Sequence, residues 1–131
     1  MDMLQSTLGG YDASKVMTLE EAVNKFVFDG CSVSLGGNNG KNPMGVAYEI
    51  IRQGKKDLTI VDENSLTCED MLIGAGCVKK VETSWMGISL MDLAYNLRRA
   101  MEHGIPRTIE VDDYSNYTGS LRLLAGAMNV P

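Results

Sequence analysis

Hydrophobic and polar positions recur along the chain with two periods, one typical of helices and one typical of strands. Between Leu19 and Val27 the apolar residues lie three or four positions apart, which predicts an amphipathic helix with one buried face. Thr18 and Glu21 have the spacing of a capping box, in which each side chain accepts from the other residue's backbone N–H group. We expect this helix to begin after Thr18 and to end at Gly30, since glycine favours helix C-termini.

Four further segments have the same helical spacing. They cover residues 43–53, 67–75, 89–103 and 114–128. Asn42 and Pro43 predict the start of the first of these, with Asn42 as N-cap and Pro43 in the first turn, where its missing N–H group costs nothing. Asp70 lies three residues after Thr67, the spacing of a weaker capping box. In the same segment, Ala75 is expected to face the core.

Short apolar runs separate these helices and predict strands. They cover residues 31–35, 58–61, 78–85 and 107–111. Strands that alternate with helices predict an open α/β fold, with a mainly parallel sheet and helices on both faces. Residues 1–14 have no period and are expected to form a loosely ordered N-terminal tail before a single unit over residues 15–131. The chain stops after a helix and leaves an uncovered sheet edge, so we expect a truncated front part of a larger domain.

The composition narrows the class of protein. Hydrophobic residues make up 44% of the chain and charged residues 22%, and the net charge of -5 argues against binding nucleic acid by general attraction to phosphates. There is no signal-peptide pattern and no apolar stretch of the about 18 residues that a membrane helix needs. Cys31, Cys68 and Cys77 form no CxxC pair and are expected to be buried free thiols. These features predict a cytoplasmic protein, and no spacing suggests a metal site.

A turn-rich loop from Gly36 to Asn42 follows the first predicted strand and leads into a helix N-terminus. Ligands of open α/β sheets bind beyond the carboxyl ends of the strands, and successive glycines allow backbone N–H groups to converge on an anion. The loop therefore suits a phosphate, a carboxylate or a thioester oxyanion, although a tight turn without a ligand explains the glycines equally well. Its spacing fits neither a Walker A loop nor the dinucleotide fingerprint.

Acidic residues follow the second predicted strand at the same edge. A carboxylate of Asp62 or Glu63 could act as a nucleophile or a base, but acids at such places are more often solvated or cap a helix. His103 is the only histidine and ends a predicted helix, where a contact with the helix dipole explains it better than catalysis does.

Several blocks of the sequence occur in the order and spacing of family I CoA-transferase A subunits, and the chain most resembles their glutaconate CoA-transferase branch. The blocks are residues 14–22, 34–37, 43, 48–54, 57–59, 71–79, 113–115 and 130–131. The resemblance covers about residues 14–131, and several separate blocks in order are more specific than any single motif.

The resemblance implies one chain of a hetero-oligomer, which pairs with a similar B subunit and is inactive alone. The implied reaction moves CoA from an acyl-CoA to a carboxylic acid through a glutamyl-CoA thioester, so a CoA thioester is the substrate and no cofactor is permanently bound. In this family the nucleophilic Glu belongs to the B subunit. The A-type chain supplies a Gly-Gly-Phe loop whose N–H groups stabilise the oxyanion, and Gly36 and Gly37 match its glycines.

The chain also departs from the family pattern. Asn38 replaces the Phe, and the loop that contains Asn38 and Asn39 is one residue short before Pro43. Glu63 takes a place comparable to that of the nucleophile in the similar B chain, which makes it a candidate catalytic residue. Two alternatives remain open: a CoA-ester hydrolase subunit on the same scaffold, and a truncated, non-catalytic chain that binds a partner.

Overall fold

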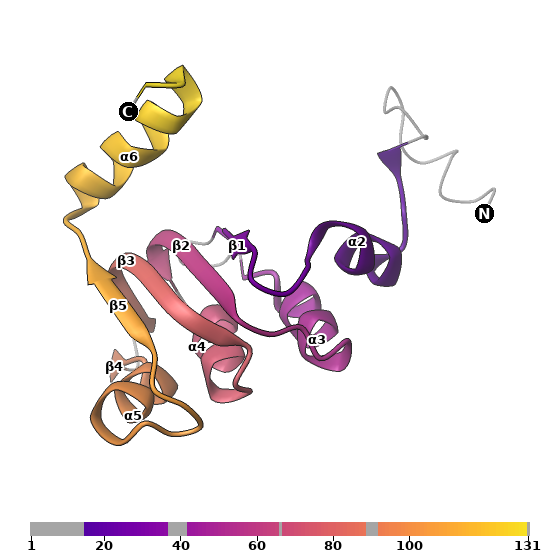
Figure 1. Ribbon diagram of the computed structural model, residues 1–131, viewed down its shortest axis with the longest axis horizontal. Helices are drawn as coiled ribbons and strands as arrows, with labels where there is room; N and C mark the ends of the chain where they lie inside the picture. Colours follow the sequence, from indigo (N-terminus) through magenta and orange to yellow (C-terminus); the bar gives the residue numbers. More distant parts are fainter. Residues whose placement is uncertain (1–14, 37–41, 66, 89–91, 131) are drawn as a thin grey trace.

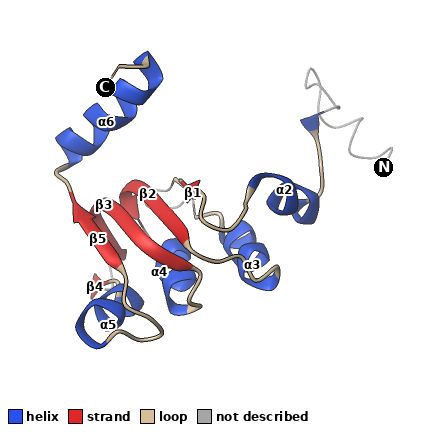
Figure 2. Ribbon diagram, in the orientation of Figure 1, coloured by secondary structure: helices blue, strands red, loops and turns tan. Residues whose placement is uncertain are grey.

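The computed structural model describes residues 15–36, 42–65, 67–88 and 92–130. Their order along the chain is α2 (Leu19–Phe26), β1 (Ser32–Val33), α3 (Met44–Arg52), β2 (Leu58–Ser65), α4 (Thr67–Gly74), β3 (Val78–Ile88), β4 (Asp92–Leu93), α5 (Tyr95–His103), β5 (Glu110–Asp113) and α6 (Asn116–Met128). This alternation confirms the predicted α/β class (Figure 2). The predicted tail of residues 1–14 lies outside the described residues.

The sheet is mainly parallel, as predicted. Strand β2 pairs in parallel with β1 on one side and with β3 on the other, and β5 pairs in parallel with the outer side of β3. The strand order β1-β2-β3-β5 therefore proceeds in one direction across the sheet. Because crossovers between parallel strands are right-handed, this order places the connecting helices α3, α4 and α5 on one face. They pack side by side there, as Figure 1 shows.

The hydrophobic core lies between this helix layer and the sheet. Helix α3 contributes Ala47 and Ile50 to the core, both fully buried, at the three-residue spacing that predicted its inner face. Strand β2 contributes Leu58 and Ile60, also fully buried. The other buried apolar residues are Val23, Cys31, Cys68, Leu72, Ile73, Cys77, Val78, Val81, Met86, Ala94, Ala100 and Ile109.

The second face of the sheet is polar and carries α6. Lys80 of β3 forms ion pairs with Glu82 on the same strand, at 2.9 Å, and with Asp112 of β5, at 2.7 Å. Helix α6 rises from the end of β5, away from α3, α4 and α5 (Figure 1), and contacts β2 and β3. The predicted helix is thus confirmed, but none of its residues is buried. Its apolar side chains are exposed, among them Tyr117, Leu121, Leu124 and Met128.

The largest difference from the sequence prediction concerns residues 89–103. One helix was expected there, but α5 begins only at Tyr95, and Asp92–Leu93 form β4, antiparallel to Gly87–Ile88. Strand β2 ends at Ser65, opposite Met86, so the last residues of β3 need another backbone partner, which β4 supplies.

Smaller differences occur at element ends. Helix α2 has the predicted capping box at Thr18 but ends at Phe26, and Gly30 lies in the turn before β1. Strand β1 covers only Ser32–Val33, and β5 begins at Glu110. Ala75 is exposed because it follows the end of α4. These shifts follow tertiary contacts rather than the local pattern.

Candidate functional site

The parallel strands bring three segments of polar residues to one edge of the sheet. Residues 34–36 follow β1, residues 62–65 form the last half of β2, and residues 82–85 lie beside them in β3. The register pairs Asp62 with Thr83 and Asn64 with Trp85, so these segments are in direct contact. The edge where the sequence predicted a ligand thus exists, but residues 62–65 belong to a strand and not to a loop.

Asp62 anchors the segment that leads into the predicted Gly-rich loop. Its Oδ1 accepts from the Ser34 hydroxyl at 2.7 Å and from the Gly36 N–H at 3.3 Å, and its Oδ2 accepts from the Leu35 N–H at 3.1 Å. Only 8% of Asp62 is exposed. The expectation of a solvated loop acid is therefore wrong for Asp62, which β2 carries into contact with the chain after β1.

Of the predicted oxyanion-binding residues, the structure describes only Gly36. It has a φ of +59°, a left-handed conformation that favours glycine, and its N–H points at Asp62. Gly37, Asn38 and Asn39 lie outside the described residues. Oxyanion binding by this loop stays a prediction, and the Gly36 N–H is already bonded to Asp62.

The starts of α3 and α4 are joined at the same edge. Asn42 was expected to cap α3, but the N-cap of α3 is Pro43, which makes no side-chain cap. The Asn42 Oδ1 instead accepts from the N–H of Cys68 in the first turn of α4, at 3.3 Å. The sequence could not show this contact, because it links residues 26 positions apart. It ties the end of the predicted loop to α4.

The first turn of α4 contains two buried residues: Cys68, which the sequence predicts to be a buried thiol, and Glu69, which the sequence analysis does not single out. The Cys68 thiol donates to Glu69 Oε2 at 2.9 Å, and these residues are 0% and 1% exposed. Burial, reinforced by the bond to Glu69, raises the pKa of Cys68 to about 12, so the thiol stays protonated near neutral pH. Glu69 could have been found from the sequence, because it occupies a position where the helical spacing calls for an apolar residue.

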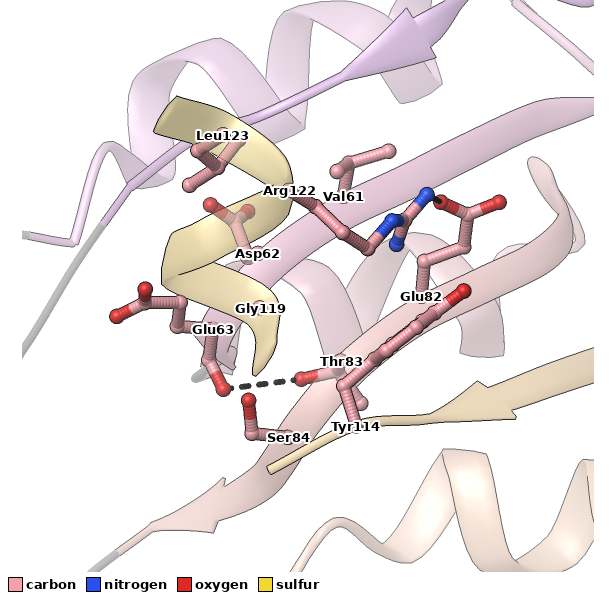
Figure 3. A pocket seen from close by; sticks show the side chains of 10 residues that line it. All are labelled: Val61, Asp62, Glu63, Glu82, Thr83, Ser84, Tyr114, Gly119, Arg122 and Leu123. Carbon is pink, nitrogen blue, oxygen red and sulfur yellow. Dashed lines mark hydrogen bonds and ion pairs between the residues drawn. The ribbon is translucent and has the colours of Figure 1, made fainter. Parts of the chain in front are cut away.

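Glu63 points to the other face of the sheet from Asp62, toward α6. Its side-chain Oε1 accepts from the Ser120 hydroxyl, and its Cγ lies 3.5 Å from the position of a Cβ on Gly119. Figure 3 shows Glu63 beside Gly119 and Ser84. The backbone carbonyl of Glu63 accepts from the Thr83 hydroxyl at 3.3 Å. The structure therefore does not bring Glu63 together with Gly36, although both lie near the carboxyl edge.

A small cavity lies between β2, β3 and α6 (Figure 3). Arg122 closes one side: its Nη2 lies 2.6 Å from Glu82 Oε2, and its guanidinium is 4.3 Å from the centre of the Tyr114 ring. The Ser84 hydroxyl is buried without a hydrogen-bond partner among the described residues. The cavity volume is about 20 Å³, enough for roughly one water molecule but not for an acyl group.

Other chemistries find little support in the part of the chain that the structure describes. No three His, Cys, Asp or Glu side chains there are grouped to hold a metal ion. His103 ends α5, as predicted, and lies 3.8 Å from Glu102 on the surface. None of the helices in the described ranges is long and apolar enough to cross a membrane.

Comparison with known proteins assigns this scaffold to a family. The family model of coenzyme A transferase matches residues 16–131. The A subunit of 3-oxoadipate CoA-transferase from Pseudomonas knackmussii is 41% identical over 118 residues, which are 90% of this chain and 42% of that protein. The A subunit of glutaconate CoA-transferase from Acidaminococcus fermentans is 33% identical over 120 residues, 90% of this chain and 37% of that protein.

Solved structures agree with this assignment. The crystal structure of glutaconate coenzyme A-transferase from Acidaminococcus fermentans superposes with a TM-score of 0.79 at 32% identity, over 89% of this chain and 37% of that chain. A variant of the decarboxylase AibA/AibB gives a TM-score of 0.74, also at 32% identity, over 88% of this chain and 44% of that chain. The chain thus spans less than half the length of each of these relatives.

Proposed function

The chain belongs to the coenzyme A transferase family, and we propose that it is the front part of an A-type subunit that moves CoA between an acyl-CoA and a carboxylic acid. The observation that carries this proposal is the family match over residues 16–131, together with A-type relatives at 41% and 33% identity. The position of the predicted Gly-rich loop agrees with it, because the loop leaves β1 at the carboxyl edge of the sheet.

In the proposed mechanism this chain supplies the oxyanion side of a shared site. When a carboxylate attacks a thioester carbonyl, the carbonyl oxygen gains negative charge, and preorganised backbone N–H groups stabilise it. We assign these donors to the loop that begins at Gly36 and Gly37. The nucleophilic Glu comes from a B-type partner, which carries the glutamyl-CoA thioester intermediate. The substrate CoA is the only cofactor that this scheme requires.

Glu63 is the alternative place for the nucleophile within this chain. Two observations weaken the proposal for Glu63: its carboxylate is bonded to Ser120, and it faces α6 instead of the loop after β1. The adjacent cavity has room for about one water molecule and therefore cannot hold a thioester. We therefore assign Glu63 to the contact with α6.

The direct test mixes the 131-residue chain with a B-type partner and measures CoA exchange between acetate and glutaconyl-CoA or 3-oxoadipyl-CoA. Transfer is expected only when both chains are present. Trapping with hydroxylamine, followed by peptide mass analysis, is expected to place the modified Glu on the partner. A modified Glu63, or full transfer by this chain alone, would overturn the assignment of roles.

The same assay separates the other reactions that this scaffold could support. The likeness to a decarboxylase makes such alternatives concrete, so the products must be identified. A hydrolase would release free CoA without an acceptor acid, and a decarboxylase would release carbon dioxide. Replacement of Gly37 by Val adds a test of the loop, because a bulky side chain at this position is expected to disturb the backbone donors and lower the transfer rate.

A further inference from the structure

We propose that Asp62 is the positioning residue of the Gly-rich loop, fixing the backbone that leads into the loop without contacting the substrate. The predicted effect of Asp62 on catalysis rests on the proposed function, whereas its hold on residues 34–36 does not. It starts from one carboxylate that accepts from three consecutive residues, Ser34, Leu35 and Gly36.

The register of the sheet explains why Asp62 can make these contacts. Ser32 pairs with Thr59 and Val33 with Ile60, and continuing this register places Leu35 opposite Asp62. Strand β1 ends at Val33, so the backbone ladder no longer holds Leu35 or its neighbours. The Asp62 carboxylate takes over as acceptor of the N–H groups of Leu35 and Gly36. It ends the strand and directs the chain into the loop.

The environment of Asp62 makes this attachment strong. The residue is 8% exposed, and no Lys, Arg or His of the described ranges forms an ion pair with it. A buried carboxylate without a cation is stabilised by its hydrogen bonds, and bonds to an ionised acceptor are stronger than neutral ones. The Ser34 hydroxyl and the N–H groups of Leu35 and Gly36 therefore have their acceptor in Asp62, and these three donors in turn stabilise its buried carboxylate.

Gly36 transmits this attachment to the loop. Its φ of +59° turns the chain at the point where the N–H bond to Asp62 holds it. At the far end, Asn42 is tied to the first turn of α4 through the N–H of Cys68. Gly36 and Asn42 are thus each bonded to a neighbouring strand or helix, and Asp62 makes the bond at Gly36.

The first experiment measures this attachment in the chain alone. Hydrogen exchange of the Leu35 and Gly36 amides is followed by NMR in the wild type and in the Asp62→Asn variant. The exchange is expected to accelerate about tenfold or more, because charge-assisted bonds to both amides are weakened. Glu63→Gln is the matched control: it changes the next residue of the same strand, which faces α6, and is expected to leave both amides unchanged.

Unchanged exchange in a folded Asp62→Asn variant would overturn the proposal. If that variant does not fold, Ser34→Ala decides, because Ser34 is exposed and its loss removes one bond to the same carboxylate. Exchange at Gly36 should then rise several-fold, and no change in this variant would also overturn it.

The second experiment measures the catalytic consequence in the complex with a B-type partner. A displaced loop loses transition-state contacts, so Asp62→Asn is expected to lower kcat on the order of tenfold to hundredfold while KM changes little. Faster exchange with an unchanged kcat would show that Asp62 is only structural. If the wild-type complex transfers no CoA, the proposed function fails, while the exchange measurement still decides whether Asp62 holds the loop.

Discussion

Asp62 and Glu63 are neighbours on β2, yet their carboxylates serve opposite faces of the sheet. Asp62 accepts from Ser34, Leu35 and Gly36, whereas Glu63 accepts from Ser120 of α6. The period of two along a strand separates the two side chains. Strand β2 therefore makes side-chain hydrogen bonds both to residues 34–36, on one face of the sheet, and to α6, on the other.

Asp70 caps a helix to which it does not belong. Its carboxylate accepts from the N–H of Leu97 at 2.8 Å and from the N–H of Asn96 at 3.2 Å, whereas the N-cap of α5, Ala94, offers no side-chain acceptor. We expect Asp70→Ala to lower the free energy of unfolding by about 1–2 kcal/mol, as loss of an N-cap does. Urea unfolding measures this, and Asp113→Ala, a change at an exposed acid, should have a clearly smaller effect.

Gly74 leaves room for Asn96. A Cβ on Gly74 would lie 2.7 Å from Asn96 Cγ, closer than side-chain atoms tolerate. We expect Gly74→Ala to destabilise the protein by about 1–3 kcal/mol, because Asn96 must move and its 2.9 Å bond to Asp70 is lost. Thermal unfolding provides the measurement.

Two further variants make the Gly74 test specific. In a Gly74→Ala background, Asn96→Ala should cost less than it does alone, because the obstructing side chain is already displaced. Gly126→Ala is the control within α6. Apart from the nearby backbone of α6 itself, no described residue has an atom within 4 Å of its Cβ position, so the change should be neutral or stabilising by up to about 1 kcal/mol. Additive effects of the changes at 74 and 96 would contradict the proposed contact.

Glu82 gives stability a predictable pH dependence. Lys80 and Arg122 lower the pKa of Glu82 in the folded protein, whereas the pKa of a Glu in an unfolded chain is about 4.3. Ionised Glu82 therefore contributes fully to the free energy of unfolding above the pKa of the unfolded chain. This contribution is lost as the pH falls through the lowered pKa of the folded protein. We expect unfolding free energies measured between about pH 6 and pH 3 to fall less steeply for Glu82→Gln than for the wild type.

The control for this slope is Glu102→Gln. Glu102 pairs with Arg98 at 2.8 Å on the surface of α5, and about half of its side chain is exposed, whereas Glu82 is 12% exposed. Because solvent screens the exposed pair, its removal should change the slope less. If Glu102→Gln changed the pH slope of stability more than Glu82→Gln does, the proposed contribution of the ion pair between Glu82 of β3 and Arg122 of α6 would be rejected.

The three thiols should be inert in the folded protein. Cys31, Cys68 and Cys77 are 9%, 0% and 4% exposed, and burial raises the pKa of Cys68 to about 12 and raises that of Cys77 as well. We expect a thiol reagent at pH 8 to modify none of them in the native protein within minutes and all three in denaturant. As a control, the Ser32→Cys variant has an added thiol at an exposed position, which should react at once. Rapid modification of the folded wild-type protein would contradict the structure.

Elements with local signals could be predicted from the sequence. Thr18 and Glu21 form a capping box in both the prediction and the structure, and the three-residue spacing of Ala47 and Ile50 marks the buried face of α3. A hydrogen bond within four residues, or a repeat within one helix, depends on neighbours in the chain, so a pattern can reveal it. The parallel sheet followed from the alternation of these elements.

The tertiary structure alone decided which polar groups meet. The sequence predicts that Asp62 is a solvated or helix-capping acid and that Asn42 caps α3. In the structure Asp62 holds residues 34–36 and Asn42 caps α4, each across 26 or more positions of sequence. In the same way β4 replaced part of a predicted helix, because the end of β3 needed a partner. A buried donor or acceptor takes the partner that the fold brings within reach, and only the packed sheet specifies which one that is.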